Sequence, residues 1–182
     1  MIETLPTYVA ERYSPLEIEF LDATKKFLSE NLPRISERVL DEWRKAIATA
    51  CEVQSIERIP CAYMSVSFLN TAIATGKTIL QIDFYDRQWV YGKHFSRSRM
   101  DADFLLTGWK DFTDKTFDEK FFVRSSISTV EIKSLFWGTL DKVIFIFTCF
   151  VKYFAPAIKN CDEFAALIKS EKFYITCGTY LD

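Results

Sequence analysis

The segment Ile82–Phe95, with the sequence IDFYDRQWVYGKHF, holds the side chains of this chain that are best suited to chemistry. It combines carboxylates, phenol and indole rings and the only histidine of the protein. A carboxylate beside aromatic rings can hold a cationic or planar ligand. We therefore predict a ligand site here, completed by an amide from the segment that precedes it. The predicted ligand-binding residues are Asn70, Asp83, Tyr85, Asp86, Trp89 and His94.

The same segment also has the composition of a turn that needs no ligand. Aromatic side chains are favoured in strands and pair across hairpins, whereas Asp and Arg are favoured in turns. Leu80, Ile82 and Phe84 alternate with polar residues, which predicts a half-buried strand. The residues QWVYG after Arg87 predict the returning strand of a hairpin, with a helix over residues 86–95 as the alternative. A structural turn and a ligand site therefore both remain open.

His94 limits the possible mechanisms because it is the only histidine. A two-histidine metal site cannot form within one chain, and no G-x-S-x-G motif supplies a serine nucleophile. One specific role remains, since a single histidine in a helical, Phe-rich chain could be the proximal ligand of haem in a globin-like sensor. Gly92 and the strand-like residues before it argue against a regular helix around His94. Haem is thus an alternative, and no other cofactor is predicted.

Other motifs give no metal or nucleotide site. The five cysteines form no C-x-x-C pair, and Asp101 with Asp103 offers only two carboxylates, so we predict no metal site. The sequence ATGKT at residues 74–78 ends like a P-loop, but it follows a predicted helix and lacks the first glycine. An enzyme would have to use carboxylate or tyrosine chemistry, which requires a carboxylate with a raised pKa in a cleft.

The elements that would position these residues are mostly helical in the first part of the chain. Ser14–Glu17 has the pattern of a helix start, and apolar residues continue at helical spacing to about Cys51. Pro33 either divides this segment into two helices or kinks one helix. Pro60 predicts the start of a further helix over residues 61–75, which is apolar nearly all round and is therefore expected to be buried.

The second part of the chain predicts three more helices and a strand. Apolar residues at helical spacing predict a helix over residues 100–112. Ser128–Glu131 is a capping box that begins a long helix, which Pro156 is expected to end. Asn160 is predicted to start a last short helix. The tail over residues 172–181 has the composition of a strand that could pair with the hairpin.

The composition supports one mainly α domain over residues 1–182. Only 5 glycines and 5 prolines are present, too few for a many-stranded barrel with many tight turns. We predict an all-α, single-domain bundle of five to six helices with a small β-hairpin, or a three-stranded sheet, inserted mid-chain.

Charge and hydropathy limit the partners. The net charge of −2 offers no general attraction to nucleic acid. The apolar run Val143–Val151 is too short to cross a bilayer, which needs about 20 residues, and the N-terminus has no signal-peptide pattern. We therefore predict a cytoplasmic protein with no membrane span. The Phe-rich helix 129–154 is apolar over more than one face, which predicts either a central core helix or a homodimer interface.

The segment SFLNTAIATGKTILQIDFYDRQW resembles a group of uncharacterised bacterial proteins from anaerobes. In that group a similar helix, a glycine, a strand that ends in Asp-x-Tyr-Asp and a tryptophan occur in this order. The resemblance covers residues 61–112 best and the tail TCGTYLD less well. It implies no activity and assigns no catalytic residue, and the position of His94 is not a histidine in that pattern.

The leading functional hypothesis is a non-catalytic cytoplasmic module that binds a small ligand or a protein partner as a homodimer. A haem-binding sensor that uses His94 and an enzyme with carboxylate or tyrosine chemistry are the two alternatives.

Overall fold

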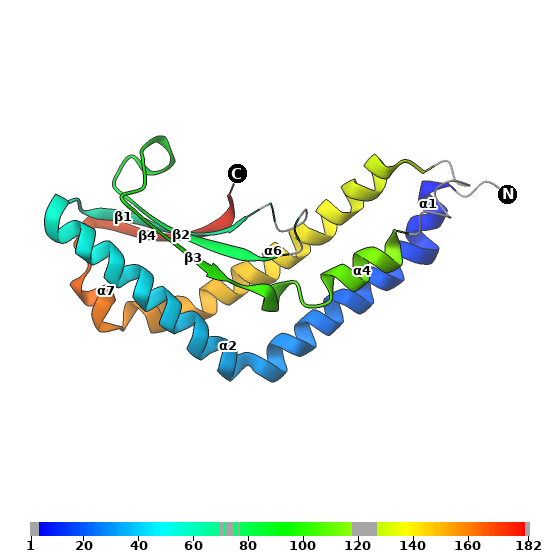
Figure 1. Ribbon diagram of the computed structural model, residues 1–182, viewed down its shortest axis with the longest axis horizontal. Helices are drawn as coiled ribbons and strands as arrows, with labels where there is room; N and C mark the ends of the chain where they lie inside the picture. Colours follow the sequence, from blue (N-terminus) through cyan, green and yellow to red (C-terminus); the bar gives the residue numbers. More distant parts are fainter. Residues whose placement is uncertain (1–3, 70, 72–74, 76, 118–126, 181–182) are drawn as a thin grey trace.

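The computed structural model describes residues 4–69, 71, 75, 77–117 and 127–180. These residues form a mixed α/β arrangement, so the prediction of an all-α bundle with a small hairpin is wrong. Two long helices, α2 (Ser14–Glu57) and α6 (Thr129–Lys159), extend along the molecule and carry a four-stranded sheet at one end (Figure 1).

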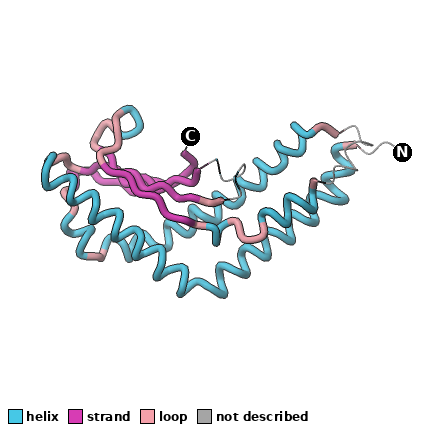
Figure 2. Tube along the Cα trace, viewed as in Figure 1, coloured by secondary structure: helices cyan, strands magenta, loops and turns pink. Residues whose placement is uncertain are grey.

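The sheet consists of β1 (Cys61–Leu69), β2 (Ile79–Tyr85), β3 (Ser96–Asp101) and β4 (Lys169–Tyr180), in the order β3-β2-β1-β4. β1, β2 and β3 pair antiparallel, whereas β4 pairs parallel with β1. The helices lie on one side of the sheet, and the loop between β2 and β3 rises on the other (Figure 2). One face of the sheet therefore belongs to the core, and the loop between β2 and β3 lies over the other.

Alternation along the strands explains this arrangement. Met64, Val66 and Phe68 of β1 are buried on the core face, and Ser65 and Ser67 alternate with them on the opposite face. The core face packs against α2 and α6, where the largest fully buried side chains include Trp43, Ile47, Phe147 and Phe154. A period of two is that of a strand with one face in the core.

The predicted helix over residues 61–75 is therefore wrong. Cys61–Leu69 is a central strand, while residues 70, 72–74 and 76 lie outside the described part of the chain. The error has a physical cause, because a short apolar run suits a buried helix and a buried strand equally well. The serines 65 and 67 are small enough to read as part of a helix that is apolar nearly all round.

The predicted strand at β2 is confirmed, but its partner is not the segment QWVYG. Trp89–Tyr91 is a short 3-10 turn, and the returning strand is β3. The predicted helix over residues 100–112 is also wrong, since β3 continues to Asp101 and helix α4 covers Trp109–Thr116. The strand β3 was missed because it lies at the edge of the sheet, where strands carry charged residues and lack the alternation of a half-buried strand.

The C-terminal half follows the predictions more closely. The tail is a strand as predicted, although it pairs parallel with β1 and not with the hairpin. The capping box of Ser128 and Glu131 at the start of α6 is confirmed, with Ser128 N donating to Glu131 Oε2 at 2.7 Å. Pro156 does not end α6, which continues to Lys159. The last helix, α7, covers Asp162–Ala166 with Cys161 as its N-cap, in place of Asn160.

α2 is one continuous helix with Pro33 inside it, which agrees with the second of the two alternatives, and it bends about midway (Figure 1). It does not begin with a cap at Ser14, because helix α1 (Leu5–Tyr8) and the π-helical segment Val9–Tyr13 lead directly into it.

Beyond the sheet, the first half of α2, α4 and the first half of α6 form a helical arm. Its core is aromatic, and the ring of Phe112 stacks on Phe20 with 5.0 Å between centroids. Glu17 lies in this core and accepts a hydrogen bond from Thr139 Oγ1 at 2.6 Å. It also forms an ion pair with Lys142 at 2.7 Å. Satisfied polar groups of this kind fix the pairing of α2 with α6.

One helix in the described part of the chain, α6, is long and apolar enough by length and composition to cross a membrane. Core helices of non-membrane proteins meet the same criterion, and Val143, Phe147 and Phe154 of α6 are buried in this structure. There is thus no clear membrane span, but the helix is longer than the nine-residue run on which that prediction rested.

Candidate functional site

The polar face of the sheet is organised around Asp83, which is 1% exposed. Arg97 Nε on β3 donates to Asp83 Oδ1 at 2.6 Å, and Gln81 Nε2 and the Tyr85 hydroxyl donate to Asp83 Oδ2 at 2.9 and 3.2 Å. Arg99 Nε continues the network with a bond to Gln81 Oε1 at 3.1 Å. Buried carboxylates are stable when paired and fully hydrogen-bonded, and Asp83 meets both conditions.

Next to this network lies a pocket of about 460 Å³, open to solvent. Its floor is formed by Ser65 and Ser67 of β1 and by Thr176 and Gly178 of β4. The strand register places Ser65 beside Thr176 and Ser67 beside Gly178, so small residues stand in adjacent rows. Small side chains on neighbouring strands leave the hollow, and three of the four supply hydroxyl groups.

The wall of the pocket is formed by Tyr85 at the end of β2 and by the loop that follows. Trp89, Gly92 and His94 of this loop line the pocket. The rings of Tyr85 and His94 meet edge to face, with 6.3 Å between their centroids. The hydroxyl of Tyr85 is already bonded to Asp83, so the buried network fixes this part of the wall.

Trp89 is held in an unusual conformation. Its φ of +49° lies in the left-handed region, which a bulky residue adopts at a cost of about 1–3 kcal/mol. Its ring stacks on Tyr63 of β1 at 4.8 Å and 12°, and Tyr63 stacks in turn on Tyr174 of β4 at 5.5 Å. The stacked rings hold Trp89 against the sheet and offset part of this strain.

Gly92 lets the loop close on itself beside the pocket. A Cβ at this position would lie 2.8 Å from Gln88 Cβ and 3.6 Å from Asp86 Oδ1. Real Cβ atoms do not approach so closely, so any larger residue would move the loop. Gly92 is therefore a determinant of the pocket wall.

Two polar atoms at the pocket are buried without a hydrogen bond to any described residue: Trp89 Nε1 and Thr176 Oγ1. A buried polar group without a partner costs about 1–3 kcal/mol, and each such group in a native protein calls for an explanation. Trp43 Nε1 in the core is also unpartnered, but Trp43 does not line this pocket. Both atoms are covered by neighbouring atoms of the protein, so a bound molecule reaches them through a shift of the side chains at the pocket wall.

The surroundings of His94 favour its neutral form over its charged form. Its pKa lies below the ordinary value of 6.5 because burial penalises the charged form and because Arg97 is near, with Asp83 opposing the shift. A neutral imidazole offers one donor and one acceptor. The described residues that line the pocket therefore combine hydroxyl groups with aromatic rings and include no acidic or basic side chain other than the neutral imidazole.

The structure brings together some of the predicted site residues and separates others. Tyr85, Trp89 and His94 line the same pocket. Asp83 lies beside it and is fully occupied by its donors, while Asp86 accepts from Gln88 N at 2.8 Å and lines a separate hollow with Arg58 and Lys169. Asn70 lies outside the described residues.

The sequence missed the floor of the pocket. Ser65 and Ser67 alternate with apolar residues, and this signal of a strand was present in MSVSF. Thr176 and Gly178 could not be placed from the sequence, because only the parallel pairing of β4 with β1 brings them there.

His94 does not lie in a helix of a globin-like fold. It follows the short turn Trp89–Tyr91 and precedes β3, on the polar face of a sheet. The haem alternative therefore loses the helical surroundings on which it rested. Among the described residues, no group of three or more His, Cys, Asp or Glu side chains could hold a metal ion.

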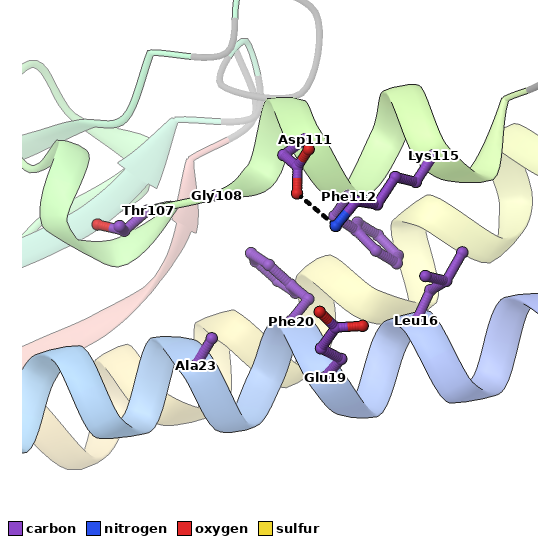
Figure 3. Close-up of a pocket in the computed structure, with 9 residues that line it drawn as sticks. All are labelled: Leu16, Glu19, Phe20, Ala23, Thr107, Gly108, Asp111, Phe112 and Lys115. Atoms are coloured by element: carbon purple, nitrogen blue, oxygen red, sulfur yellow. Dashed lines mark ion pairs between the residues drawn. The ribbon is translucent and has the colours of Figure 1, made fainter.

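A second hollow, in the helical arm, is a packing gap. It measures about 80 Å³ between α2 and α4, well below the roughly 300–1,000 Å³ of typical ligand pockets. Figure 3 shows Phe20 and Phe112 between the two helices and the ion pair of Asp111 with Lys115, which is 2.8 Å long, at the rim. The stacked rings join α2 to α4, the ion pair lies within α4, and the gap between the helices is too small for a ligand.

Comparison with known protein families, curated proteins and solved structures gives no match for this chain.

Proposed function

We propose that this protein is a binding module that holds a small, uncharged, polar molecule in the pocket between the Trp89–His94 loop and the serines of β1. A volume of about 460 Å³ suits a metabolite-sized ligand. The proposal extends the sequence-based hypothesis of a small-ligand module, but it moves the ligand from Asp83 to the floor beside it.

The charge of the lining argues for an uncharged ligand. The carboxylate of Asp83 is neutralised by the guanidinium of Arg97, and neither side chain lines the pocket. The groups that line it include hydroxyls, an indole, a thiol and a neutral imidazole, and no carboxylate, ammonium or guanidinium group. An ionic ligand would lose part of its hydration here without gaining a counter-charge, which disfavours its binding.

The observation that carries the proposal is the pair of buried, unpartnered polar atoms at the pocket. The indole nitrogen of Trp89 can only donate, so a ligand that reaches it must offer an acceptor. Thr176 can donate or accept. A molecule with a carbonyl or hydroxyl oxygen near the indole would satisfy both, and it would help to offset the strain at Trp89.

The test is native mass spectrometry of protein purified from its own host, compared with the denatured mass. We expect an extra mass that is lost on denaturation. Trp89→Phe keeps an aromatic ring but removes the N–H donor. It should lower the affinity for the ligand about five- to tenfold, and the share of chains that carry the extra mass should fall accordingly.

The matched control is Trp43→Phe, which removes an equally unpartnered indole donor from the core. It should leave ligand occupancy unchanged. A bare chain mass for the wild type, or an equal loss of ligand in both variants, would contradict the proposal.

An enzyme remains the second candidate function, and it would use Tyr85 and His94. They are the two side chains of the pocket lining that combine acid–base chemistry with contact to each other. To test this, the released ligand is added back to the protein and its mass is measured after incubation. A mass that differs from that of the ligand on host-purified protein would indicate that the protein converts the bound molecule.

A further inference from the structure

The two edges of the sheet differ in how they are protected. β3 has only six residues, carries Arg97, Arg99 and Asp101, and is tied to α2 by Arg38 Nη2, which donates to the Asp101 carbonyl at 3.0 Å. Short length, charged side chains and a covering element are the usual means by which proteins prevent edge strands from pairing with other chains.

β4, at the opposite edge, lacks these protections over most of its length within the described part of the chain. It is twelve residues long, and its charged residues, Lys169, Glu171 and Lys172, are all in its first third. The segment 173–180, FYITCGTY, carries no charge and no proline. On its outer side it has no neighbouring strand among the described residues.

The side chains of this segment are also less covered than those of the inner strands. Phe173, Ile175 and Cys177 pack against the core but are only partly buried, whereas Met64, Val66 and Phe68 of the adjacent β1 are fully buried. Tyr174 on the polar face is 48% exposed. The apolar row of β4 therefore ends at an open edge and lacks the neighbour that a further strand would supply.

We propose that this edge pairs with the same edge of a second copy of the chain, so that two β4 strands run antiparallel and form one continuous eight-stranded sheet. The charge pattern of β4 favours a second copy of this chain as the partner of the edge. A two-fold axis within residues 173–180 places an uncharged segment against itself, and the charged first thirds of the two strands point away from each other.

This arrangement also has a consequence for the pocket. An axis perpendicular to the sheet keeps both polar faces on one side, and Thr176 and Gly178 of β4 form part of each pocket floor. The two pockets would therefore lie near each other on one surface, separated by the paired strands. The proposal does not rest on a ligand, because it follows from the edge alone.

The test is the mass of the full chain in solution, measured by light scattering after size-exclusion chromatography. The wild type should have twice the 21.2 kDa of one chain. Tyr174→Glu with Thr179→Glu changes two exposed side chains of the segment, one on each face of the strand, and should give a monomer, because it gathers four like charges along the paired edges. Tyr174→Lys with Thr179→Lys should do the same.

An equal mixture of the Glu and Lys variants should recover the mass of a dimer, which misfolded variants could not do. Phe145→Glu serves as the comparison, because Phe145 is 69% exposed on α6, the helix for which the sequence predicted a dimer interface. It should leave the dimer intact. A monomeric wild type, a dimer that persists in both charged variants, or a dimer lost only through Phe145→Glu would overturn the proposal.

Discussion

At the scale of single residues, Asp83 has a structural role that its sequence context did not reveal. Asp83→Asn replaces an acceptor of three side-chain donors and leaves the guanidinium of Arg97 without its counter-charge. We expect a loss of about 2–3 kcal/mol in the free energy of unfolding, measured by urea denaturation. Asp86→Asn is the control, because an amide oxygen can still accept from Gln88 N, and it should cost less than about 0.5 kcal/mol. Equal stability of the two variants would contradict the assignment.

His94 gives a prediction about pH at the same scale. Its pKa in the folded protein lies below 6.5, so the unfolded chain binds the proton more tightly than the folded chain. The free energy of unfolding should therefore fall as the pH drops from about 6.5 through the folded pKa, and should not change for this reason at higher pH. Because the chain has one histidine, a single imidazole signal in an NMR titration reports this pKa directly. The step below pH 6.5 should be absent in His94→Gln, and a pKa at or above 6.5 would refute the prediction.

At the scale of elements, two glycines with opposite surroundings make a matched pair. Gly138 lies inside α6, and a Cβ added there would meet nothing within 4 Å, so Gly138→Ala should raise the free energy of unfolding by about 0.5–1 kcal/mol. Gly92→Ala should instead displace the pocket loop, since its Cβ would meet Gln88 Cβ. Adding Gln88→Gly removes that contact and should restore the loop. Thermal denaturation and ligand occupancy are measured on Gly138→Ala, Gly92→Ala and the Gly92→Ala, Gln88→Gly double variant. A Gly92→Ala variant as stable as Gly138→Ala, with unchanged ligand occupancy, would show that the loop tolerates the side chain.

The elements also show how far the sequence could predict this structure. Local signals were sufficient where one rule dominates: the capping box of Ser128 was right, and so were the strand at β2 and the strand in the tail. They failed at β1, where a short apolar run fits either a strand or a buried helix, and at β3, where charges conceal an edge strand. For the site, the sequence found Tyr85, Trp89 and His94 because they are adjacent along the chain. It could not find Thr176, which lies beside Ser65 only through a parallel pairing of strands 111 positions apart.

At the scale of the whole molecule, the pocket and the open edge share β4, so binding of the ligand and pairing of two chains should be coupled. Pairing holds Thr176 and Gly178 in place by hydrogen bonds on both sides of the strand, which lowers the entropy cost of ordering the pocket floor when a ligand binds. By linkage, a ligand that prefers the paired chain must favour pairing by the same factor. Native mass spectra of the wild type over a dilution series should therefore show the extra mass on the dimer and a depleted extra mass on the monomer. Removing the ligand by mild denaturation and refolding should shift the dimer-to-monomer midpoint to higher protein concentration. Monomers that keep the ligand at the same occupancy as dimers would show that the two properties are independent, although each could still be true alone.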